Sequence, residues 1–147
     1  MSAFSRTTTI RILALLCLAA VVGVVASSPG RTDVADEAIQ LHLKLYAAAI
    51  YEHHSRTGAW PTQIDDLAQS SLPVQSPYWR QMLADEVFVI VWPQGFDEDP
   101  QRNASRVLAY HNKGTLARSG SIWVCWGDLR TEYIKDGELS AHLRRGE

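Results

Sequence analysis

The chain has 147 residues, of which 46% are apolar and 20% charged, with 14 Lys and Arg against 16 Asp and Glu. This length suits one domain with a modest core, and the apolar content excludes an intrinsically disordered chain. The formal charge of −2 gives no overall attraction for nucleic acid, and two cysteines are too few for a disulfide framework or a Cys-only zinc site.

Residues 1–30 have the pattern of a signal peptide or an N-terminal membrane anchor with its linker. Arg6 and Arg11 are their only charged residues, and the run from Ile12 to Ala26 that follows is apolar. Fifteen residues are few for a transmembrane helix, which needs about 20, and are the upper limit for the apolar part of a signal peptide. The positions that we assign to the membrane segment include Ile12, Leu16, Val21 and Val25.

Two locations follow from this segment, and the sequence leaves both open. If it is kept, the protein is a single-pass protein of the cytoplasmic membrane with the rest of the chain outside the cytoplasm. If it is cleaved after Ala26, the protein is secreted. In either case residues 31–147 form an extracytoplasmic domain.

A long amphipathic helix is predicted from Asp33 to about Arg56, and Gly58 is expected to end it. Its apolar residues form two adjacent stripes, which together predict a wide packing face: Val34, Ala38, Leu41, Leu45 and Ala48, and beside them Ile39, Leu43, Tyr46 and Ile50. A short helix over Gln63–Gln69 is expected next. Residues 70–86 are predicted to be mainly loop, with a helical turn near Arg80–Ala84.

Strands dominate the second half of the chain. Val87–Trp92 is apolar on both faces, so it should be central in a sheet or covered on both sides. Val107–His111 and Ser121–Trp126 are the next strands, and the more polar Leu129–Ile134 suits an edge. A last short helix is expected over Glu138–Leu143. The fold class is therefore α+β, with the long amphipathic helix packed on an antiparallel sheet of about four strands.

Three stretches, in this order of elements, resemble the type IV pilin and pseudopilin family, in particular major-pseudopilin-like proteins of type II secretion. The first is the basic start with its apolar segment and amphipathic helix. The second runs from Leu45-Tyr46 to Gly58-Ala59-Trp60-Pro61-Thr62 and is similar to the family's L-x-x-Y and G-x-Y-P pattern. The third, Val107–Tyr110 with Ile122–Ile134, is similar to a C-terminal hairpin common in exported pseudopilin-like proteins of planctomycete-type bacteria.

The chain also departs from this family at three places. Residues 1–30 contain no prepilin peptidase motif, and Pro29-Gly30 interrupts the passage from membrane segment to helix. Asp128-Leu129 stands where the family's hairpin has Asp-Gly, and Leu tolerates a positive φ poorly. The resemblance implies a pilin-like fold and work through protein–protein contacts in a secretion or pilus-type assembly.

The resemblance further implies calcium binding in a loop of the C-terminal region, as in pseudopilins of the secretion type. The acidic loop offers hard oxygen ligands in Asp97, Glu98, Asp99 and Asn103. These residues lack the alternating spacing and central Gly of an EF-hand loop. The alternative is a solvated charged loop, and no other cofactor is expected.

Trp60 and Trp79 stand in loop-like surroundings, beside Pro61 and in a Pro-rich segment, and are the candidates for exposed tryptophans. Exposed Trp side chains would bind a glycan or a peptide. The alternative is that both cap the core between helix and sheet.

A catalytic role has weak support. His111 and Asp128 can be combined with Ser119 or Ser121 near one end of the sheet, but no motif such as Gly-x-Ser-x-Gly surrounds these serines. We therefore expect a non-enzymatic exported protein of the cell envelope, which contacts envelope proteins or associates with itself and binds no nucleic acid. The alternative is an extracytoplasmic glycan- or peptide-binding module.

Overall fold

The computed structural model describes residues 34–112 and 120–145. The predicted membrane segment, with Ile12, Leu16, Val21 and Val25, and the predicted domain boundary after residue 30 lie outside the described residues and stay predictions. Among the helices that are described, none combines the length and the apolar character needed to cross a membrane.

The predicted long helix is confirmed as α2, Val34–Thr57. Asp36 and Glu37 lie in its first turn and Arg56 in its last, where each charge is favourable to the helix dipole. Gly58 ends the helix with a φ of +76°, and its N–H donates to the His54 carbonyl over 2.7 Å. Glycine is the residue that adopts this left-handed conformation without strain, so the sequence fixes where α2 stops.

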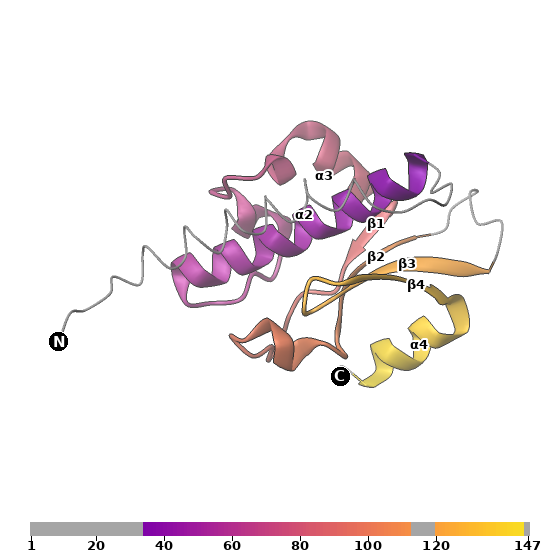
Figure 1. Cartoon of the computed structure of the whole chain (residues 1–147). Coiled ribbons are helices and arrows are strands. Elements are labelled where there is room, and N and C mark those ends of the chain that lie inside the picture. Colours follow the sequence, from indigo (N-terminus) through magenta and orange to yellow (C-terminus); the bar gives the residue numbers. More distant parts are fainter. Residues whose placement is uncertain (1–33, 113–119, 146–147) are drawn as a thin grey trace. The chain divides into compact units, whose positions relative to one another are not determined.

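Four antiparallel strands form one sheet in the order β1-β2-β3-β4, so each strand pairs with its neighbour in the sequence. The strands are β1 (Phe88–Ile90), β2 (Val107–His111), β3 (Ser121–Trp126) and β4 (Thr131–Lys135). Helix α2 packs against this sheet, as Figure 1 shows. The expected α+β class, a long helix on a four-stranded antiparallel sheet, is confirmed for the described residues.

The connection from α2 to β1 carries three short helical segments. They are η2 (Ile64–Leu67), η3 (Pro73–Gln75) and α3 (Pro77–Ala84), so the helical turn expected near Arg80–Ala84 begins three residues earlier than predicted. This connection also packs against α2 (Figure 1). Helix α4 (Asp136–Arg145) follows β4 directly, and η4 (Pro100–Asn103) lies in the acidic loop between β1 and β2.

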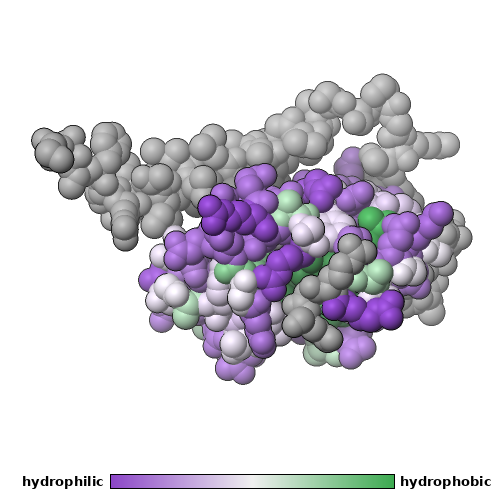
Figure 2. Space-filling model, turned by 90° about the horizontal axis from the view of Figure 1, so that it is seen from below, coloured by the Kyte–Doolittle hydropathy of each residue, from purple (hydrophilic) through white to green (hydrophobic). Residues whose placement is uncertain are grey.

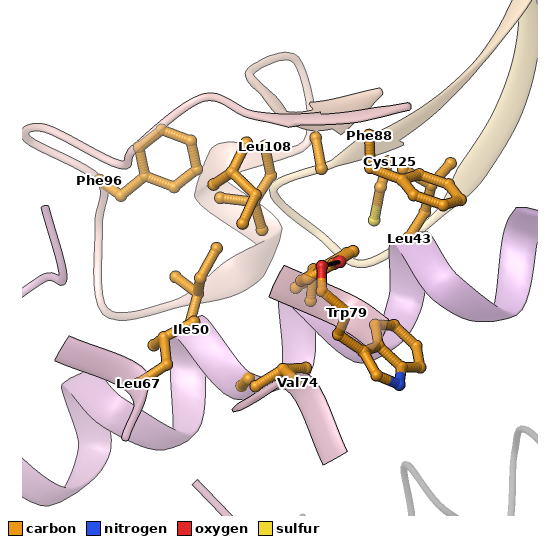
Figure 3. Close-up of a cluster of buried hydrophobic side chains, with 14 residues drawn as sticks. Leu43, Ile50, Leu67, Val74, Trp79, Phe88, Phe96, Leu108 and Cys125 are labelled. Atoms are coloured by element: carbon orange, nitrogen blue, oxygen red, sulfur yellow. Dashed lines mark hydrogen bonds between the residues drawn. The ribbon is translucent and has the colours of Figure 1, made fainter. Parts of the chain in front are cut away.

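Two apolar clusters form the core. The larger cluster, drawn in Figure 3, joins side chains of α2 to those of the η2–α3 connection and of the strands, among them Leu43, Ile50, Leu67, Val74, Trp79, Phe88, Leu108 and Cys125. The smaller cluster joins the sheet to α4 and contains Val107, Ile122, Val124, Trp126, Ile134 and Leu139. The sheet is therefore packed on both faces.

Two details differ from the sequence predictions. Val87–Trp92 is not central, because β1 is an edge strand. Its face with Phe88 and Ile90 is covered by the larger cluster, and Val91 packs against the smaller one, but Val89 belongs to neither cluster and is only partly buried. The wide apolar face of α2 is packed unevenly: Leu43 is fully buried and Leu45 packs against the larger cluster, whereas Leu41 keeps 39% of its surface exposed.

Candidate functional site

The first half of α2 and the start of α3 (Pro77–Ala84) each carry one exposed large apolar residue, Leu41 and Tyr78. Large exposed hydrophobic side chains among the described residues are Leu41, Tyr78 and Tyr133. The Tyr78 ring lies 6.0 Å from the ring of His42, which is the neighbour of Leu41, and the His42 ring nitrogen bonds to the Ala38 carbonyl over 2.7 Å. We call Ala38, Leu41, His42 and Tyr78 the α2 patch.

Buried neighbours fix the geometry of this patch. The His42 ring stacks on Trp79 at 4.3 Å and on Phe88 at 5.2 Å between ring centroids. Tyr46, which is fully buried, donates its O–H to the Trp79 carbonyl over 2.8 Å. Burial raises the pKa of Tyr46, so its hydroxyl stays a donor at any physiological pH. Helix α3 is thus held against α2 by Trp79, and the adjacent Tyr78 is kept at the surface with 57% of its area exposed.

The His42 ring of the α2 patch is bonded to the Ala38 carbonyl and stacked on Trp79 and Phe88, so the patch has the character of a contact surface. An exposed tyrosine on a rigid helical support is typical of the anchors of protein–protein contacts, and the leucine adds apolar area to the same surface. The face of the molecule in Figure 2 is mostly hydrophilic, and its hydrophobic colour is confined to small areas among the coloured residues. The α2 patch is therefore the candidate functional site.

The prediction that both Trp60 and Trp79 are exposed binding residues is wrong for Trp79, which keeps 8% of its surface and belongs to the core. Trp60 is half-buried, and its indole N–H donates to the Phe96 carbonyl over 3.1 Å. The Trp60 ring also stacks on His54 at 3.9 Å and meets Tyr51 edge-on at 5.2 Å. These contacts agree with the alternative prediction, in which the Trp60 and Trp79 rings cap the core between helix and sheet.

The acidic loop uses its oxygens to hold its own backbone. Asp97 accepts from the Asp99 N–H and from Arg102, which together hold the pKa of Asp97 below its ordinary value, and Asp99 accepts from the Gln101 N–H. Asn103 is 1% exposed, and its side-chain oxygen accepts from the Asp97 N–H over 2.9 Å. Glu98 is exposed. This arrangement lends no support to the calcium hypothesis, which stays a prediction.

Asn103 is the centre of a polar contact that the sequence did not indicate. Its side-chain amide donates to the Tyr51 hydroxyl oxygen over 3.0 Å, and the Tyr51 O–H donates to the Gly127 carbonyl over 2.6 Å. This contact ties the acidic loop and the β3–β4 turn to α2. Tyr51 and Gly127 are 76 residues apart in the chain, so no local spacing could have signalled it.

His111 and Asp128 of the hypothetical catalytic group do not meet. His111 is the last residue of β2, whereas Asp128 follows Trp126, which pairs with Val107 at the first residue of β2. Four residues of strand separate these ends by about 13 Å. Ser119 lies outside the described residues. The placement of His111 and Asp128 at one end of the sheet was therefore wrong.

Within the part of the chain that the structure describes, no metal site and no reactive thiol takes the place of that group. No three His, Cys, Asp or Glu side chains lie close enough to hold a metal ion within residues 34–112 and 120–145. Cys125 is fully buried, and burial raises the pKa of its thiol to about 12. A thiol in that state is neither a nucleophile nor a ligand at neutral pH.

Comparison with known proteins adds no assignment: no family model, no curated protein and no solved structure matches this chain.

Proposed function

We propose that this protein is a non-enzymatic component of the cell envelope that acts through protein–protein contacts, with a pilin-like extracytoplasmic domain whose α2 patch binds the partner. The partner is another envelope protein or a second copy of the chain. The apolar N-terminal run places the domain at the membrane, or secretes it if the run is cleaved. A link to a secretion or pilus-type assembly rests on the resemblance of the sequence to pseudopilins.

The exposed pair Leu41 and Tyr78 carries this proposal. Leu41 retains 39% and Tyr78 57% of its surface, and Tyr133 is the other large hydrophobic residue of the described chain that is exposed to this degree. Leu41 lies on the regular helix α2, and Tyr78 adjoins the buried Trp79, so a partner would meet a preformed surface and little conformational entropy would be lost on binding. The alternative, a glycan- or peptide-binding module, required both Trp60 and Trp79 to be exposed, and Trp79 is buried.

Photo-crosslinking in cells tests the proposal. A benzoylphenylalanine in place of Leu41 should give a covalent adduct on irradiation, because the partner covers this position. The same residue in place of Ser55, which is exposed near the end of the same helix, is the matched control and should give at least about fivefold less adduct. An adduct of twice the chain's mass identifies self-association, and any other mass identifies an envelope partner.

A double variant, Leu41→Asp with Tyr78→Asp, tests whether these two side chains are needed for partner binding. Both positions are exposed, so each change should alter the free energy of unfolding by less than about 0.5 kcal/mol. The adduct formed from a benzoylphenylalanine at Ala38 should nevertheless disappear. Equal yields from the Leu41 and Ser55 positions, or an adduct that survives the double variant, would contradict the proposed contact.

A further inference from the structure

The outer edge of β1 is open for hydrogen bonding. The Val87 carbonyl accepts from the Asn112 N–H and the Val91 N–H donates to the Leu108 carbonyl, both over 2.9 Å, and Val89 pairs with Tyr110 between them. In an antiparallel pair, alternate residues bond to the neighbouring strand. The N–H and C=O groups of Phe88 and Ile90 therefore point away from β2, on a side where no other strand of the described sheet lies.

A groove of about 800 Å³ runs along this edge. One wall is β1 with Trp92, and the other consists of α3 and η2. Apolar side chains of Ile64, Leu83 and Trp92 line it, together with Ala84. Tyr78 is not among its lining residues, so the groove is a surface distinct from the α2 patch.

The unpaired charge at the groove is negative. Arg80 contributes to one wall but is already paired with Asp65, at 2.5 Å between Nη2 and Oδ1. Glu86 also lines the groove and is exposed, and its carboxylate has no hydrogen bond or ion pair to any described residue. Glu86 follows α3 with a φ of +54°, a conformation in which glycine is the unstrained residue, yet a charged side chain occupies this position.

We propose that this groove binds an extended segment of another protein, which adds a fifth strand to the sheet beside β1. Its backbone pairs with the outward N–H and C=O groups of Phe88 and Ile90. Its alternate side chains are apolar and enter the groove, and a Lys or Arg side chain pairs with Glu86. Strand addition at an open sheet edge takes its affinity from main-chain hydrogen bonds and its specificity from such alternate side chains.

A selection experiment on the full chain, kept in detergent micelles, tests this. Random nine-residue peptides displayed on phage are selected against the wild-type protein and, in parallel, against an Ala84→Trp variant whose indole fills the groove. The expected result is enrichment on the wild-type protein alone of sequences in which apolar residues alternate and a Lys or Arg recurs at one position. Failure to enrich any sequence beyond the Ala84→Trp background would overturn the proposal.

Charge variants test the contact with Glu86. Glu86→Lys should weaken the selected peptides by about tenfold, because an attraction becomes a repulsion. Glu98→Lys, an exposed acidic residue of the acidic loop, makes the same charge change away from the groove and should leave the affinity within about twofold. Equal weakening by both variants would show that the peptides respond to net charge alone and would overturn the assigned contact.

Amide hydrogen exchange locates the bound strand. A selected peptide should slow the exchange of the Phe88 and Ile90 amides, and the same peptide N-methylated at alternate residues should not. Slowed exchange elsewhere in the sheet or on α2, or pairing of β1 with a second copy of the chain, would overturn the proposal. These measurements do not depend on the α2 patch, so their failure and the failure of the proposed function can be told apart.

Discussion

At Gly127 the backbone passes directly over the acidic loop. A Cβ atom there would lie 2.4 Å from Asn103 Cβ, 2.7 Å from the Asn103 carbonyl oxygen and 2.9 Å from the Phe96 ring. The first two of these neighbours belong to a buried residue held by Tyr51 and Asp97, so they cannot move aside at low cost. The absence of a side chain at Gly127 is therefore what lets the loop, the turn and α2 meet.

We predict that Gly127→Ala lowers the free energy of unfolding by about 2 kcal/mol or more, since the methyl group forces the loop and the turn apart. Urea denaturation followed by tryptophan fluorescence measures the change. Gly137→Ala is the matched control: Gly137 lies in α4 with no atom within 4 Å of the added Cβ, so this change should be neutral or stabilising. Equal effects of the two substitutions would contradict the argument from close approach.

At Leu129, two residues after Gly127, backbone strain is opposed by side-chain packing. Its φ of +70° lies where the hairpin of the resembled family has a glycine, and the sequence had indicated this conflict. The side chain is partly buried against the larger core cluster. Burial of the Leu129 side chain therefore offsets part of its backbone strain. A side chain added at Gly127 would instead overlap Asn103, and no apolar contact would compensate for that overlap.

At the scale of elements, periodicity predicted that α2 exists and where it ends, but not which apolar stripe is packed. Both stripes repeat at helical spacing, so both fit a core-facing helix. The structure buries the stripe that contains Leu43, Tyr46 and Ile50 and exposes Ala38 and Leu41 of the other. Which apolar residues of α2 are buried depends on where the sheet and the η2–α3 connection pack against the helix. The sequence of α2 alone does not contain this information.

Strand β1 illustrates the same limit. Its apolar residues on both faces predicted a central or doubly covered strand, but β1 pairs with β2 alone, and only Phe88 and Ile90 on one face are buried. The groove on its open side is formed partly by α3, in a segment that the sequence predicted as mainly loop. The candidate groove could not be found before the position of α3 was known.

The contact between the first turns of α2 and the sheet should respond to pH through His111. Burial lowers the pKa of His111 from its ordinary value of 6.5, the nearby Asp36 partly opposes this, and His42 adds to it. The His111 ring packs on Phe88 at 5.3 Å, and Asp36 accepts from the Trp123 indole N–H over 3.1 Å. The folded protein therefore favours the neutral imidazole.

We predict that stability falls as the pH drops below about 6.5, because the unfolded chain then binds a proton that folded His111 takes up only at lower pH. Well above pH 6.5 both states hold the neutral ring and this contribution is fully present. Urea midpoints measured from pH 7.5 to 5 should fall less steeply for His111→Gln than for the wild-type chain. Parallel slopes would show that His111 does not carry the dependence.

At the scale of the whole molecule, the two core clusters share one sheet. Strand β2 supplies Leu108 and Ala109 to the cluster with α2, and Val107 and Tyr110 to the cluster with α4. All members of both clusters lie among the described residues. A sheet that is packed on both faces cannot lose one layer without exposing the apolar residues of that face, so the two layers should unfold together.

We predict that a fragment of residues 34–147 folds without the N-terminal segment and unfolds in one transition, with coincident urea curves from far-UV circular dichroism and tryptophan fluorescence. Leu43→Ala in the cluster with α2 and Leu139→Ala in the cluster with α4 should each shift that one transition, by about 2–4 kcal/mol, because Leu43 is fully buried and Leu139 is 5% exposed. A Leu139→Ala variant that loses only helical signal at low urea would show instead that α4 unfolds separately. A fragment that fails to fold would mean that the first 33 residues supply part of the core.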